Sequence, residues 1–221
     1  MSYTVYSYLV DLPRLRALYG SHDDALLTAV EAENADVLRE DETPVVATVM
    51  REGLPPTREV QPLPTPTLRA ALREILAGTV LPVENGDQYW YAVELLCAHV
   101  GVRLPNEQFE AINGRRLGIL EELDGLQDLA LQSRQPLPLP LPAPADFPAV
   151  TYVHRGEARA ILTRLPAVHL SLPYDDAGME EWDDATLEAW EREWPKRLQV
   201  LYRQWLEEAA RTGRDLIAFL Y

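Results

Sequence analysis

Apolar residues along this chain follow patterns typical of both strands and helices. Residues 3–10 (YTVYSYLV) and 215–221 (DLIAFLY) are rich in aromatic and β-branched side chains, which predicts a strand near each end. Shorter runs of the same kind predict strands over residues 45–50, 149–153 and 167–172. We expect the N-terminal, middle and C-terminal strands to form one small sheet.

Helical periodicity accounts for most of the remaining chain. One helix runs from Asn85 or Asp87 to Gly101 and is apolar on nearly all sides, so we predict that it is the central, covered helix of the fold. Residues 183–212 place apolar side chains three or four positions apart, with a kink or a fresh start expected at Pro195. Shorter helices are predicted over residues 12–19, 22–39, 66–77, 115–131 and 155–165.

These patterns predict an α+β fold, a helix-rich single domain over residues 1–221. The proline-rich residues 135–148 (QPLPLPLPAPADFP) must be extended, because alternating proline favours a polyproline conformation. We interpret them as a stiff connector inside that domain, with leucines on the body surface, although they could also serve as a ligand for proline-binding modules. The alternative organisation is a helical lobe over residues 1–133 and an α/β lobe over residues 149–221.

The negative charge of the chain is concentrated in two segments. Residues 22–42 carry eight acidic residues against one arginine, and residues 175–193 carry nine against one arginine. These segments account for the whole formal net charge of −15, because the rest of the chain has as many bases as acids. Two acidic surfaces on an otherwise balanced body favour a basic partner, although such charge also simply increases solubility.

The composition limits the classes of function. A single cysteine, Cys97, allows no internal disulfide and suits a reducing compartment. The sequence lacks a signal-peptide pattern and any apolar stretch long enough to span a bilayer, so the expected location is the cytoplasm. Nucleic acid and anionic membranes are not expected as partners, because both require basic surfaces. Nineteen arginines against one lysine indicate a GC-rich coding bias, which is typical of many bacteria.

No standard catalytic motif is present in the sequence. The nearest constellation is Glu94, Cys97 and His99 in the predicted central helix. Glu94 and Cys97 are three residues apart and share a face, whereas His99 points elsewhere. A thiol–imidazole pair would need a histidine from another part of the fold. The alternative interpretation is that these are ordinary residues of a buried helix.

His154 is the best single candidate for a small-molecule site. It lies at a predicted strand-to-helix junction beside Arg155 and Glu157, and binding residues are common in such connections. The tyrosines within residues 3–8 could line the same pocket. No metal or cofactor is predicted, because the acids of residues 175–184 (DDAGMEEWDD) come in adjacent pairs and do not fit the register of a calcium loop.

Three stretches of the chain resemble an uncharacterised bacterial family of about this length. They are SYTVYSYLVDLPRLRALYGS, QYWYAVELLCAHVG and GRDLIAFLY, which correspond to a tyrosine-rich start, a YAxELLC-type helix and an aromatic C-terminal strand. The proline connector is longer here than is typical of that family. The resemblance implies a one-domain bacterial cytosolic protein and brings no activity, cofactor or site residues.

The sequence supports three hypotheses of function. The first is a non-enzymatic protein whose acidic surfaces bind a basic protein, as immunity proteins and nucleic-acid mimics do. The second is a small-molecule-binding protein or enzyme with a pocket near His154 and the N-terminal tyrosines. The third is a structural subunit that forms a homodimer. The residues chosen for the acidic docking surfaces are Asp23, Asp24, Glu31, Asp175, Asp176, Glu180 and Glu181.

Overall fold

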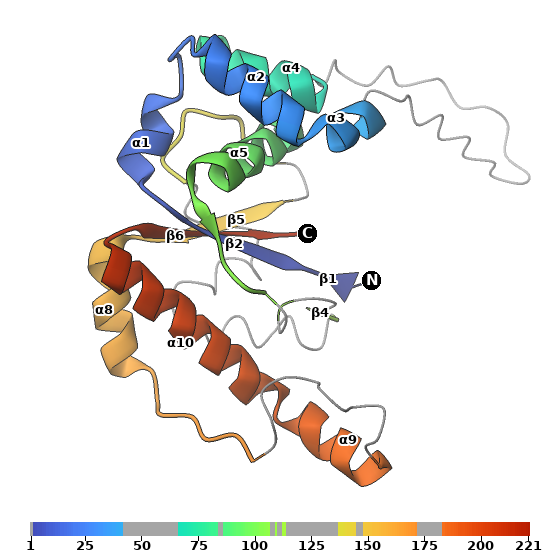
Figure 1. Cartoon of the computed structure of the whole chain (residues 1–221), viewed down its shortest axis with the longest axis vertical. Coiled ribbons are helices and arrows are strands. Elements are labelled where there is room, and N and C mark those ends of the chain that lie inside the picture. Colours follow the sequence, from blue (N-terminus) through green and yellow to red (C-terminus); the bar gives the residue numbers. More distant parts are fainter. Residues whose placement is uncertain are drawn as a thin grey trace, which may run out of the picture.

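The computed structural model has a four-stranded antiparallel sheet with helices on both of its faces (Figure 1). The α+β fold predicted from the sequence is confirmed, and the sheet combines N-terminal, middle and C-terminal strands. The strand predicted over residues 45–50 and the helix predicted over residues 115–131 lie outside the described residues. The structure describes residues 2–41, 66–83, 86–106, 109, 112–113, 137–144, 148–171 and 183–221.

The C-terminal strand lies in the interior of the sheet. β6 (Asp215–Leu220) pairs with β2 (Val5–Val10) on one side and with β5 (Ala149–Val153) on the other, and all six residues of β6 are buried. The two ends of the chain are therefore held in neighbouring strands. Two further strands of two residues each, β1 (Ser2–Tyr3) and β4 (Ile112–Asn113), pair with each other as a separate sheet. In sheet order the four strands are β3 (Val102–Arg103), β2 (Val5–Val10), β6 (Asp215–Leu220) and β5 (Ala149–Val153).

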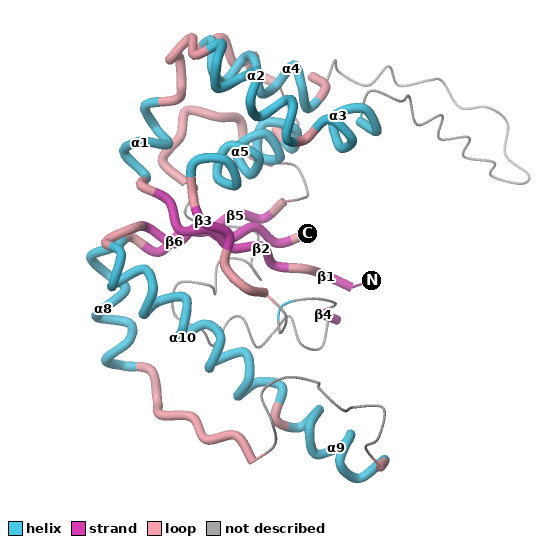
Figure 2. Tube along the Cα trace, in the orientation of Figure 1, coloured by secondary structure: helices cyan, strands magenta, loops and turns pink. Residues whose placement is uncertain are grey.

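Two layers of helices lie on opposite sides of the sheet (Figure 2). Strand side chains alternate between them, so that Tyr8 and Ile217 belong to the core under the first layer, and Leu9 and Leu216 to the core under the second. None of the described helices is long and apolar enough to cross a membrane. The first layer consists of α1 (Leu12–Ala17), α2 (Asp24–Glu33), α3 (Ala35–Asp41), α4 (Leu68–Ala77) and α5 (Asp87–Val100). The second consists of α8 (Arg155–Arg164), α9 (Asp184–Arg192) and α10 (Trp194–Thr212).

Helix α5 is the central helix of the first layer, as its apolar sequence predicts. It contacts α4 and α2 on one side and strands β2 and β3 on the other. Tyr89, Trp90, Val93, Leu96 and Cys97 are all at most 2% exposed. A helix with this much apolar surface is stable only when it is enclosed, and the sheet and the surrounding helices provide that enclosure.

The described part of the proline connector, residues 137–144, is docked on α5. We expected the leucines of this connector to lie on the body surface, but Leu137 is buried in the first-layer core. The indole Nε1 of Trp90 donates a hydrogen bond to the carbonyl of Pro142 at 2.8 Å. Gly86 permits this contact, because a Cβ at that position would lie 2.5 Å from the Pro142 oxygen. The connector is therefore an integral wall of the fold.

The C-terminal helical region is broken where Pro195 predicts. α9 ends at Arg192 and α10 begins at Trp194, with Pro195 in its first turn. The strand predicted over residues 167–172 is wrong, because residues 166–171 form a loop. Side chains of α10 and of the residue before it, rather than a neighbouring strand, make hydrogen bonds with this loop. Arg203 donates to the carbonyl of Leu165, and Ser171 donates from its backbone N–H and hydroxyl to Glu193.

Candidate functional site

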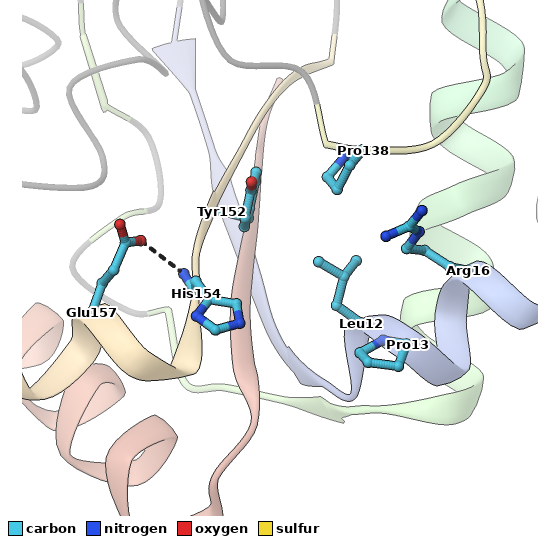
Figure 3. Close-up of a pocket in the computed structure, with 7 residues that line it drawn as sticks. All are labelled: Leu12, Pro13, Arg16, Pro138, Tyr152, His154 and Glu157. Carbon is cyan, nitrogen blue, oxygen red and sulfur yellow. Dashed lines mark hydrogen bonds between the residues drawn. The ribbon is translucent and has the colours of Figure 1, made fainter.

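A pocket of about 610 Å³ opens beside strand β5, where three segments far apart in the sequence meet (Figure 3). Helix α1, the proline connector and the β5–α8 junction each form one wall. The lining combines apolar surface with a few polar groups, which is the usual composition of small-molecule sites of about 300–1,000 Å³. The residues that line it are Leu12, Pro13, Arg16, Pro138, Tyr152, His154 and Glu157.

His154 uses one nitrogen of its ring to cap helix α8. Its Nδ1 accepts a hydrogen bond from the backbone N–H of Gly156 at 3.2 Å. The carboxylate of Glu157 accepts from the backbone N–H of His154 at 3.3 Å, which completes a capping box. Because Nδ1 is an acceptor here, the neutral ring carries its proton on Nε2. His154 therefore presents an N–H donor at the pocket, with its Nε2 3.8 Å from Oδ1 of the buried Asp215.

A buried carboxylate joins the elements beneath the pocket. Asp215, fully buried at the start of β6, accepts hydrogen bonds from the backbone N–H of Leu12 at 3.0 Å and of Arg155 at 2.8 Å. These N–H groups belong to the first residues of α1 and α8, so one carboxylate caps two helices on opposite faces of the sheet. The N-cap residue of α1, Asp11, makes no side-chain cap of its own.

The charge of Asp215 is balanced by a guanidinium group. Arg155 donates to both carboxylate oxygens of Asp215, from Nε at 3.3 Å and from Nη2 at 2.8 Å. The same Nη2 donates to the more exposed Asp11 at 2.8 Å. Hydrogen bonds to both aspartates raise the pKa of the Arg155 guanidinium above its usual value. Arg155 is thus committed to internal ion pairs at the base of the pocket.

Arg16 lies on the opposite side of the pocket from His154 (Figure 3). It is exposed on α1, and its guanidinium points towards the space bounded by Leu12, Tyr152 and Pro138. Within the part of the chain that the structure describes, the guanidinium of Arg16 makes no hydrogen bond or ion pair. The pocket therefore has hydrogen-bond donors on two walls and apolar surface between them.

The predicted candidate Glu94 lies in a different cluster, between α5 and the sheet. Its carboxylate accepts a hydrogen bond from the Tyr8 hydroxyl at 2.7 Å and another from the Tyr221 hydroxyl. Burial raises the pKa of Glu94 to about 7, although the Tyr8 hydrogen bond and the charge of Arg103 oppose the change. Burial and the nearby carboxylate also raise the pKa of Tyr8, so this hydroxyl remains a donor.

Cys97 and His99 have other surroundings. Cys97 is fully buried, and burial together with the charge of Glu94 raises the pKa of its thiol, which disfavours the reactive thiolate. His99 pairs with Glu33 of α2, with 2.7 Å between Nδ1 and Oε2. The three predicted residues of α5 therefore make separate contacts, and none of them lines the His154 pocket.

The N-terminal tyrosines also lie away from that pocket. Tyr8 binds Glu94, and Tyr6 packs against Tyr221 with ring centroids 5.8 Å apart. Tyr221 in turn stacks on Tyr91 at 5.4 Å. The tyrosine that lines the His154 pocket is Tyr152, on strand β5. The structure thus separates two groups that our hypothesis of a small-molecule site placed together.

The acidic residues chosen for docking lie in two distant places. Asp23 caps α2 by accepting from the N–H of Leu26 at 2.9 Å, and Asp24 is exposed in the first turn. Glu31 pairs with Arg73 at 2.8 Å. Helix α9 carries acids of the second segment on the other side of the sheet (Figure 1). The remaining residues lie outside the described residues: Asp175, Asp176, Glu180 and Glu181.

Sequence analysis overlooked several residues of this site. Arg16 and Pro138 carry no local signal, because they meet His154 only through the tertiary fold. Tyr152 did leave a local signal, because it lies two residues before His154 and alternate residues of a strand share a face. Asp215 did leave a signal that could have been used. It is a single acid at the start of the otherwise apolar stretch DLIAFLY, and an acid at such a position needs a buried partner.

The fold and the site define an α+β protein whose antiparallel sheet is enclosed by two helical layers and bordered by a pocket at the β5–α8 junction. The chain belongs to the family described as Domain of unknown function (DUF7691), whose model matches residues 1–221. The resemblance to an uncharacterised family is therefore confirmed. No curated protein and no solved structure matches the chain.

Proposed function

We propose that this protein binds a small organic molecule in the pocket between α1, the proline connector and the β5–α8 junction. The observation that carries the proposal is the convergence of Arg16 and His154 on a pocket of about 610 Å³ with apolar Leu12 between them. Ligand pockets of soluble proteins typically combine an apolar lining with a small number of oriented polar groups. The buried network of Asp215 and Arg155 holds two of the walls in a fixed relation.

The hydrogen bonds of His154 support binding rather than acid–base catalysis. A general base needs a free lone pair within reach of the substrate. The lone pair of Nδ1 is already occupied by the N–H of Gly156. The other nitrogen, Nε2, carries the proton in the neutral ring and can donate a hydrogen bond to a ligand. His154 therefore acts in this proposal as a positioning donor.

Filling the pocket is expected to abolish ligand binding. Arg16→Trp would place an indole in the pocket from the exposed side of α1, where it costs little stability. The measurement is saturation-transfer NMR with a library of small organic fragments. The matched control is Arg14→Trp, an equally exposed position on the same helix that does not line the pocket. We expect at least one fragment to bind Arg14→Trp but not Arg16→Trp. If every fragment that binds Arg14→Trp also binds Arg16→Trp, the pocket is not the binding site.

A second candidate function is binding of a basic protein, as the charge distribution predicts. It is favoured by the exposed acids on the outer surface of α9, where Asp184 and Glu188 are one helical turn apart. Complementary charge of this kind mainly accelerates encounter and depends strongly on salt. The pairing of Glu31 with Arg73 reduces the contribution of the first acidic segment.

Charge reversal on α9 is expected to slow association with poly-L-lysine at low salt more than an equal change elsewhere. The test variant is Asp184→Lys with Glu188→Lys. The control is Glu207→Lys with Glu208→Lys on α10, which changes the net charge by the same amount outside the two acidic segments. We expect about a threefold larger loss of association rate for the α9 variant. Equal losses would show that only net charge matters and would contradict a localised docking surface.

A further inference from the structure

We infer that the ligand of this pocket is an organic anion, a carboxylate or a phosphate ester, with its apolar body against Leu12, Pro13 and Pro138. This inference rests on the proposed function and specifies the chemical class of the ligand. It follows from the hydrogen-bonding character of the pocket's polar groups, which are arranged around the apolar surface.

Arg16 and His154, on opposite sides of the pocket, can both donate hydrogen bonds. Arg16 has five N–H donors and no acceptor. His154 has its acceptor nitrogen bound to Gly156, so the ring donates through Nε2–H, which lies 3.8 Å from Asp215 Oδ1, beyond hydrogen-bond distance. A ligand placed between them must therefore supply acceptors. A carboxylate or phosphate does so best, because a hydrogen bond to a charged acceptor is roughly twice as strong as a neutral one.

The neighbouring carboxylates already accept hydrogen bonds from other groups of the protein. Asp215 and Asp11 both accept from Arg155, so this one guanidinium offsets part of the negative charge of the two carboxylates under the pocket. Glu157 lies beyond His154, on the side away from Arg16, and its carboxylate accepts from the backbone N–H of His154 (Figure 3). The guanidinium of Arg16 has no such carboxylate partner among the described residues. An anion beside Arg16 therefore meets a guanidinium that no carboxylate of the described residues neutralises, whereas Arg155 is shared between Asp11 and Asp215.

The apolar surface selects for an organic body on the anion. Leu12 forms the surface between the two donors, and Pro13 and Pro138 extend it on either side (Figure 3). The Tyr152 ring provides a flat face on which an aromatic or aliphatic group can pack. An inorganic anion would leave this surface exposed to water, so it should bind more weakly than an anion that carries a hydrocarbon ring.

Three probes that share a phenyl ring test the charge requirement: benzoate, its neutral isostere benzamide, and phenyl phosphate. Titration by NMR should show that at least one anion binds about tenfold or more tightly than benzamide. Arg16→Gln should weaken the anion by a similar factor, while Arg14→Gln on the same helix should not. His154→Asn should weaken it by about threefold, because asparagine can still cap α8 but its shorter amide N–H does not reach the position of Nε2. Melting temperatures of the variants verify that they remain folded.

The outcomes separate this inference from the function on which it rests. Equal binding of benzoate, phenyl phosphate and benzamide, unaffected by Arg16→Gln, would overturn the anion class and leave the pocket as a site for neutral molecules. Failure of both anions to bind while other fragments bind in the pocket would also overturn it. If no fragment of the library is displaced by Arg16→Trp, the proposed function itself is wrong. A preference for benzoate over phenyl phosphate, or the reverse, identifies which anion the site is built for.

Discussion

Replacing Asp215 with alanine is expected to lower the free energy of unfolding by about 3–5 kcal/mol. The carboxylate is fully buried and accepts hydrogen bonds from the first N–H groups of α1 and α8 and from the Arg155 guanidinium. Its removal leaves one buried and one partly buried N–H donor without a partner, and a buried unpaired donor costs about 1–3 kcal/mol. The effect can be measured by denaturant unfolding at neutral pH.

The control for this prediction is Asp11→Ala, which removes the other carboxylate bound to Arg155. The Asp11 side chain is 50% exposed, so its ion pair should contribute no more than about 1 kcal/mol. Asp215→Asn should give an intermediate loss, because the amide oxygen can still accept from one of the two helices. Equal destabilisation by Asp215→Ala and Asp11→Ala would show that the buried carboxylate does not hold the two helical layers to the sheet.

The second large effect concerns Glu94 and pH. Burial raises the pKa of this carboxyl group to about 7, whereas in the unfolded chain it titrates near 4.5. At pH values between about 4.5 and 7, Glu94 is therefore protonated in the folded protein and ionised in the unfolded chain. The stability from this group is complete below about pH 4.5 and is lost as the pH rises through about 7. Between pH 5 and pH 8 the loss should be about 2–3 kcal/mol.

Glu94→Gln isolates this contribution. The glutamine keeps an oxygen that can accept from Tyr8 or Tyr221 but cannot ionise, so the unfolding free energy of this variant should depend less on pH than that of the natural sequence. The control is Glu188→Gln, at an exposed position on α9, which should leave the pH dependence unchanged. The measurement is denaturant unfolding of all three proteins at pH 5 and pH 8. Parallel pH profiles for the natural protein and Glu94→Gln would contradict the role assigned to Glu94.

Together these predictions separate the support of the pocket from its ligand chemistry. Asp215 acts through the helices that carry Leu12 and His154, so its loss should weaken both stability and ligand binding. Arg16 is exposed and without an internal partner among the described residues, so its loss should affect ligand binding alone. Replacing Glu94 should change the pH dependence of the unfolding free energy and leave ligand binding unchanged, because Glu94 lies in a separate cluster with Tyr8 and Tyr221.

The sequence by itself determined the local elements, because their causes are local. Apolar residues on nearly all sides predicted that α5 is enclosed, and Pro195 predicted the break between α9 and α10. Gly78, in the left-handed conformation with a φ of 68°, ends α4 where the pattern predicts. The strand predicted over residues 167–172 failed because a strand needs a partner, and propensity alone does not supply one.

Only the tertiary structure decided which residues form the candidate site. Asp215 and Leu12 are 203 positions apart, and no periodicity relates them. Tyr8 was expected beside His154 but points to the other cluster, because its register in β2 places it under α5. Pro138 reaches the pocket only because the connector docks on Trp90. Contacts of this kind depend on how layers and strands pair, which is a property of the whole chain rather than of any segment in it.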